Sequence, residues 1–149
     1  KLTVDNVAVS ARRAVLRLYT TILHGRKTTT RASLDRPDRL CASRDVDVLT
    51  LDSFSFPRVD FIKIDVEGLE AAVLSGARHT LESYHPTMLI EIDRARHNCD
   101  SFLAVHTILR ELGYGAHVCD AGELVACDDA WDAATRHANF IFIQRSKHR

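Results

Sequence analysis

The stretch FIKIDVEGLE, residues 61–70, decides how the rest of the chain is interpreted. Its first half carries the apolar side chains of a buried strand, including two β-branched isoleucines. Lys63 interrupts this apolar run, and three carboxylates, Asp65, Glu67 and Glu70, surround one glycine. The stretch therefore predicts a strand that ends in a turn rich in ionisable groups.

A helix is expected directly after this turn. Gly76 falls on its apolar face, where a missing side chain permits close approach to a sheet. His85-Pro86 ends the helix, because proline cannot continue it and pushes the preceding residue toward extended geometry. Residues 87–92, TMLIEI, then predict a second buried strand. The apolar face consists of Leu69, Ala72, Val73, Ala77 and Leu81, at helical spacing.

Strands and helices alternate along the chain, which is typical of an α/β fold with a mostly parallel sheet and helices on both faces. Ligands of such sheets bind outside the carboxyl ends of the strands, near a topological switch point. Asp65 lies at the end of one such strand, and Glu91 and Asp93 lie near the end of the next. The other expected elements are a helix over 102–112 and strands over 4–9, 14–19, 46–51, 115–119 and 139–143.

Composition favours a single cytoplasmic domain over residues 1–149. An apolar fraction of 46% and a charged fraction of 27% are ordinary for a globular protein. No uncharged apolar stretch approaches the length of a membrane span, and no signal-peptide pattern opens the chain. The four cysteines form no CxxC pair, which argues against a zinc site and for reduced thiols.

Charge is unevenly placed along the chain. The net charge is zero, yet ten Lys/Arg face only three Asp/Glu up to Arg44. We expect residues 20–44 to form an irregular loop, and residues 12–44 as a whole to be a basic insertion or lid. This segment is either a solvated surface or a surface for an anionic substrate. Nucleic acid is a weaker alternative, because Tyr19 is the segment's only aromatic residue.

The strands FIKID and LIEID share one pattern, so neighbouring strands in register would place Lys63 beside Glu91. A buried ion pair would then be the structural interpretation, and a substrate-orienting Glu91 the functional one. Asp65 and Glu67 could serve as a general base or bind a divalent cation, and spacing alone does not choose between these. Glu70 fits the first helical turn, where the helix dipole favours a carboxylate.

Residues 59–93, VDFIKIDVEGLEAAVLSGARHTLESYHPTMLIEID, resemble the core signature of the FkbM-type methyltransferases. The KIDVEG-x-E element, the helix with a small-residue face and the P-x-x-L-I-E-I strand carry the resemblance. It implies a class I Rossmann-like fold and S-adenosylmethionine-dependent O-methylation of a small-molecule or carrier-linked hydroxyl. It further implies catalytic roles for Asp65, Glu67 and Glu91, and cofactor contacts for Ser10 and Asp65.

The sequence also departs from the family pattern. No glycine-rich turn precedes a helix, and Ala11 stands where the family often has an acid. The first residues resemble the family's third strand, so the fold's first strands, which lie at the centre of its sheet, have no counterpart here. We expect part of a longer enzyme; the alternative is a non-catalytic binding or scaffolding remnant. A divalent metal is not favoured, because Lys63 explains Glu91 without one.

Overall fold

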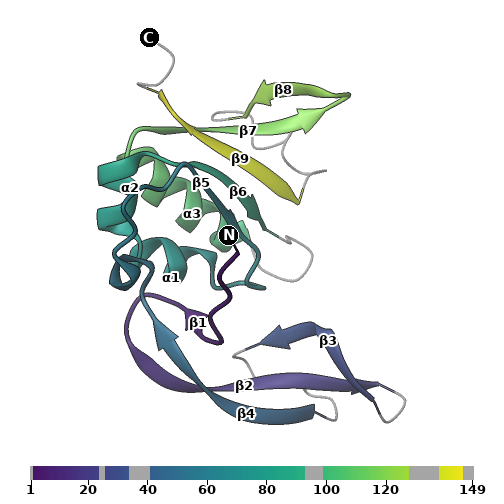
Figure 1. Ribbon diagram of the computed structural model, residues 1–149. Coiled ribbons are helices and arrows are strands. Elements are labelled where there is room, and N and C mark those ends of the chain that lie inside the picture. Colours follow the sequence, from purple (N-terminus) through teal and green to yellow (C-terminus); the bar gives the residue numbers. More distant parts are fainter. Residues whose placement is uncertain (1, 24–25, 34–40, 93–98, 128–137, 146–149) are drawn as a thin grey trace.

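The computed structural model of the chain describes residues 2–23, 26–33, 41–92, 99–127 and 138–145 (Figure 1). These residues form an α/β structure with two separate sheets. Their elements are β1 (Ala8–Val9), β2 (Ala14–Leu23), β3 (Arg26–Ser33), β4 (Cys41–Leu49), η1 (Leu51–Phe54), β5 (Phe61–Ile64), α1 (Glu70–Ser75), α2 (Arg78–Tyr84), β6 (Thr87–Glu91), α3 (Cys99–Glu111), β7 (Tyr114–Asp120), β8 (Glu123–Ala126) and β9 (Asn139–Gln144).

The larger sheet has the strand order β5-β6-β9-β7-β8. Only β5 and β6 run parallel in it, and the other three pairs are antiparallel. The expectation of a mostly parallel sheet is therefore wrong. One cause is local: β7 and β8 are joined by Ala121 and Gly122, both at positive φ, and strands joined by so tight a turn must be antiparallel.

In the described part of the chain the helices lie on one face of this sheet, so the expectation of helices on both faces is not met there. α1 contacts α3, and α3 contacts β7 (Figure 1). Alternate residues of the strands point toward these helices and are buried, because side chains of a strand alternate between its two faces. Each fully buried apolar side chain of this kind stabilises the fold by roughly 1.5–3 kcal/mol. The buried strand residues include Ile64, Met88, Ile90, Tyr114, Ala116, Val118, Phe140 and Phe142.

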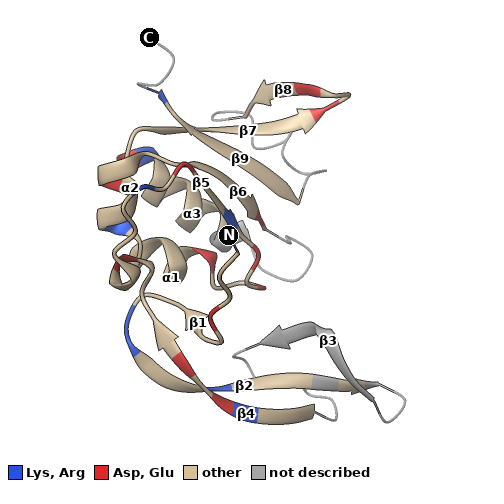
Figure 2. Cartoon of the chain, in the orientation of Figure 1, with Lys and Arg blue, Asp and Glu red and all other residues tan. Residues whose placement is uncertain are grey.

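The smaller sheet has the order β1-β4-β2-β3 and contains most of the basic segment. β2 pairs antiparallel with both β3 and β4, so the expectation of an irregular loop over residues 20–44 is wrong for its described part. Figure 2 shows acidic and basic residues interspersed along β2 and β4. In one such pair Arg17 Nε lies 3.1 Å from Asp45 Oδ1, and both side chains are exposed.

The helix expected after β5 is interrupted at Gly76 and Ala77, where α1 ends and α2 begins. The predicted close approach at Gly76 is confirmed, but its partner is the backbone that follows β1. A Cβ at position 76 would overlap the carbonyl oxygen of Ser10. Gly76 therefore lets α1 pack against the end of the smaller sheet.

Asp52 caps the second of these helices from outside it. Its Oδ1 accepts hydrogen bonds from the Thr80 N–H (2.9 Å) and hydroxyl (2.7 Å), and its Oδ2 accepts one from the His79 N–H (3.0 Å). Burial by itself raises the pKa of this carboxyl group. The hydrogen bonds and the His79 charge outweigh burial, so the pKa lies below its ordinary value. Asp52 thus accepts hydrogen bonds from backbone N–H groups in the first turn of α2, which have no partner within the helix.

His85 ends α2 in a left-handed conformation, with φ 48° and ψ 51°. Its N–H donates to the Leu81 carbonyl at 3.1 Å. The helix does stop before Pro86 as predicted, but the extended geometry expected of His85 is wrong. The left-handed residue is a common helix ending that satisfies a terminal carbonyl group.

Candidate functional site

The acidic turn lies at the carboxyl end of β5, as the sequence predicts. The strand ends at the buried Ile64, and the exposed Asp65 follows directly. The chain then turns through Glu67 at φ 53° and Gly68 at φ 101° before α1 begins. Glu70 is the first residue of α1, which confirms its predicted place in the first helical turn.

Lys63 pairs with Asp65 and not with Glu91. Its Nζ lies 3.1 Å from Asp65 Oδ2, and the two side chains are 51% and 44% exposed. The predicted Lys63–Glu91 pair is wrong because the register of the strands places Lys63 opposite Leu89. An exposed pair of this kind contributes at most about 1 kcal/mol to stability, so Asp65 is available for chemistry at little cost to the fold.

Glu91 nevertheless lies at the same level of the sheet as Asp65. Ile64 pairs with Ile90, and the two acids each follow that pair by one residue on parallel neighbours. Glu91 is half-buried and is paired across the sheet with Asn139 of β9. The structure thus gathers Asp65 and Glu91 at one strand edge, with Glu67 in the adjoining turn; their chemical roles stay predictions.

Ser10 directly follows β1 of the smaller sheet. Its N–H donates to the Leu49 carbonyl at 2.9 Å, and its own carbonyl faces Gly76. These contacts tie Ser10 to β4 and α1, not to the strand-end acids. The cofactor contact predicted for Ser10 stays a prediction.

Asp93, which also follows the second strand, lies outside the described residues. Within the described part of the chain, no three His, Cys, Asp or Glu side chains come together as a set of metal ligands. None of the described helices has the length and apolar character needed to cross a membrane.

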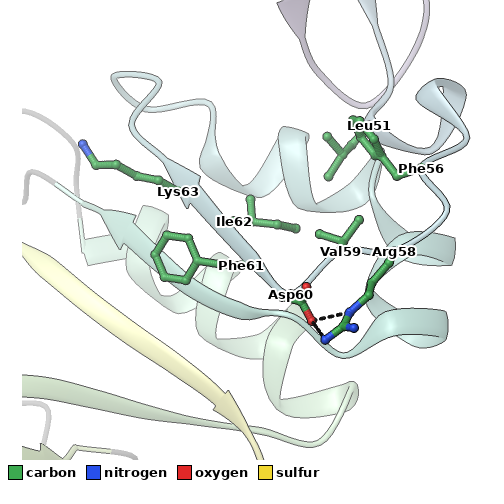
Figure 3. A pocket seen from close by; sticks show the side chains of 8 residues that line it. All are labelled: Leu51, Phe56, Arg58, Val59, Asp60, Phe61, Ile62 and Lys63. Carbon is green, nitrogen blue, oxygen red and sulfur yellow. Dashed lines mark hydrogen bonds and ion pairs between the residues drawn. The ribbon is translucent and has the colours of Figure 1, made fainter. Parts of the chain in front are cut away.

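A cavity of about 550 Å³ lies beside the first three residues of β5, Phe61 to Lys63 (Figure 3). One wall is polar and contains the ion pair of Arg58 and Asp60, in which Nη2 and Oδ1 lie 2.7 Å apart. Sequence reasoning missed this cavity, because no residue pattern along 51–63 indicates one. Its other lining residues are Leu51, Phe56, Val59, Phe61, Ile62 and Lys63.

The two ends of β5 have different surroundings. Its first three residues border an open, partly apolar cavity, whereas Asp65 and the acidic turn follow its last residue. β5 is also a terminal strand of its sheet in the described part of the chain, and β1 belongs to the other sheet. No described strand therefore pairs with β5 on the side away from β6.

Residues 7–115 of the 149-residue chain match the family described as Methyltransferase FkbM domain. The match covers more than half of the chain and includes the acidic turn and both parallel strands of the larger sheet. The chain belongs to this family, whose activity is methyl transfer. No curated protein and no solved structure matches the chain.

Proposed function

We propose that this domain takes part in S-adenosylmethionine-dependent methylation of a hydroxyl group on a small or carrier-linked acceptor. The observation that supports it is the position of Asp65 and Glu91 at the carboxyl ends of two adjacent parallel strands. In open α/β sheets this is the edge at which ligands bind. Family membership adds the class of reaction.

The hydrogen-bond acceptors at this edge fit part of the cofactor. Carboxylates accept hydrogen bonds from ammonium and hydroxyl groups, so Asp65 and Glu67 are suited to the amino and ribose groups of S-adenosylmethionine. When bound, that cofactor supplies an electrophilic methyl group on a sulfonium centre. The residues that would hold its remaining parts are not assigned, because the sequence has no glycine-rich turn before a helix.

Asp65 is the best placed residue to receive the acceptor's proton. Lys63 contacts Oδ2, and Oδ1 has no partner among the described residues. A carboxylate oxygen within hydrogen-bond reach of a hydroxyl can orient it and take its proton as the oxygen attacks. Glu67 is the second candidate for this role, and Glu91 can hold the acceptor from the neighbouring strand. Orientation alone can supply a large part of the rate acceleration.

The test replaces Asp65 by asparagine in the full-length protein. Asp65→Asn keeps the shape of the side chain and removes its basicity, so turnover should fall by about 10²–10⁴-fold while the protein stays folded. Asp60→Asn is the matched control, because Asp60 is also exposed and ion-paired but flanks the other end of β5. Transfer of labelled methyl from S-adenosylmethionine to a panel of hydroxyl compounds measures both variants.

Equal turnover in wild type and Asp65→Asn would remove Asp65 from the mechanism. A wild-type protein that binds S-adenosylmethionine but methylates nothing in the panel would favour the alternative of a binding module. Loss of turnover in Asp60→Asn as large as in Asp65→Asn would point to a general effect on the strand.

A further inference from the structure

Glu70 carries a buried carboxylate beside the acidic turn. Its residue is only 2% exposed, although it lies at the first position of α1. Burying an ionisable group is costly unless a hydrogen bond or a charge compensates it. The compensating contact is local: the Gly68 N–H donates to Glu70 Oε1 at 2.9 Å.

This hydrogen bond closes the turn that follows β5. Glu67 and Gly68 are two successive residues in the left-handed region, at φ 53° and 101°. A residue with a Cβ reaches that region only against steric strain, so Glu67 adopts it only where surrounding contacts require it. The bond from Gly68 to Glu70 is the described contact that ties the second of these residues to the helix start.

The conformation of this turn also sets the direction in which the acidic side chains point after the end of β5. Asp65 is fixed on one side by β5 and on the other by the turn. We propose that Glu70 is a positioning residue: its buried carboxylate holds the left-handed turn and thereby sets the orientation of Asp65 and Glu67. The consequence for catalysis rests on the methyl transfer proposed above, whereas the consequence for the turn does not.

Two substitutions of Glu70 distinguish the contribution of its acceptor oxygen from that of the rest of its side chain. Glu70→Ala removes the acceptor, and Glu70→Gln keeps a carbonyl oxygen at the same place. Asp52→Ala is the matched control, because Asp52 is likewise a carboxylate that accepts backbone N–H groups at a helix start, but at α2. Amide hydrogen exchange at Gly68 and the amide chemical shifts of residues 65–68 provide the readout that does not depend on activity.

We expect Gly68 to exchange about tenfold faster, or more, in Glu70→Ala, because the hydrogen bond from its N–H to the Glu70 side chain is lost. The shifts of Asp65 and Glu67 should move in that variant. Glu70→Gln should restore both measurements toward wild type, and Asp52→Ala should leave them unchanged. In the methyl-transfer assay, kcat of Glu70→Ala should fall more than KM for S-adenosylmethionine rises, with rescue by Glu70→Gln.

Unchanged Gly68 exchange in Glu70→Ala would overturn the proposal, as would equal changes at residues 65–68 in Asp52→Ala. An unchanged kcat in Glu70→Ala would remove the positioning role even if the turn had loosened. If the wild type transfers no methyl group while the exchange and shift results appear as expected, methyl transfer fails and the role of Glu70 in the turn stands.

Discussion

The two sheets of this protein are stabilised in different ways. The larger sheet buries one face against α1 and α3, and its central strands carry fully buried aromatic side chains such as Phe140 and Phe142. The described part of the smaller sheet contributes only Val46 and Val48 to the buried apolar residues. It depends instead on strand-to-strand hydrogen bonds, and its ion pair of Arg17 and Asp45 is exposed.

This difference shows where the energy of the fold resides. Apolar burial is the dominant favourable term in folding, so substitutions in the larger sheet should cost far more than substitutions in the smaller one. The acids at the end of β5 lie on the better supported sheet. A functional group held by a rigid element keeps its geometry more accurately than one held by a loop.

The largest expected effect is in the larger sheet. Phe142→Ala should lower the free energy of unfolding by about 3–5 kcal/mol, because Phe142 is completely buried between Met88 and Ala116 on neighbouring strands. Leu16→Ala in β2 should lower it by less than about 1 kcal/mol, since Leu16 is 41% exposed. Urea unfolding of both variants measures the difference. Equal losses would contradict the comparison.

A smaller effect is expected where the two sheets are joined. Gly76→Ala forces the α1 end away from the Ser10 carbonyl, and overpacking of this kind typically costs about 1–3 kcal/mol. The gain in helix propensity offsets at most about 1 kcal/mol of this. Ser75→Ala, one residue earlier and exposed, serves as the control in the same thermal unfolding experiment. A Gly76→Ala variant as stable as Ser75→Ala would show that the contact is easily relieved.

The smallest of the three effects concerns the cap that Asp52 provides to α2. Asp52→Ala should cost about 0.5–2 kcal/mol at neutral pH. Because the pKa of Asp52 is lowered from 3.8 in the fold, the stabilisation is present above pH 3.8 and is lost as pH falls through the lower folded value. Unfolding curves from pH 7 to pH 2 should therefore converge for wild type and variant at acid pH. A constant difference across that range would exclude the carboxylate as the source.

Most strands of the larger sheet were predictable from sequence, but β8 and the antiparallel directions of the sheet were not. The strands at β5, β6 and β9 are apolar runs bounded by turns, and α3 has helical spacing of its apolar residues, so each was expected near its observed place. β3 was not, because RKTTTRAS has no apolar alternation. Its threonines are a weaker strand signal, and its pairing with β2 is a property of the hairpin rather than of the segment.

The candidate site was predictable in position but not in its contacts. The pattern placed Asp65 at a strand end because strand length and the following glycine are local features. The shared pattern of FIKID and LIEID predicts a register that places Lys63 beside Glu91. The observed register of β5 against β6 differs from this by two residues, and Lys63 contacts Asp65 instead. The burial of Glu70 likewise depends on how α1 packs, and no sequence pattern indicates it.

We propose that the cofactor binds at the carboxyl end of β5 and not in the cavity beside the first three residues of that strand. Amide NMR spectra of the full-length protein, titrated with the unreactive product S-adenosylhomocysteine, test it directly. We predict that the largest shift changes include residues 65–68 and that residues 56–61 change little. Changes concentrated at residues 56–61, or no binding at all, would contradict the account.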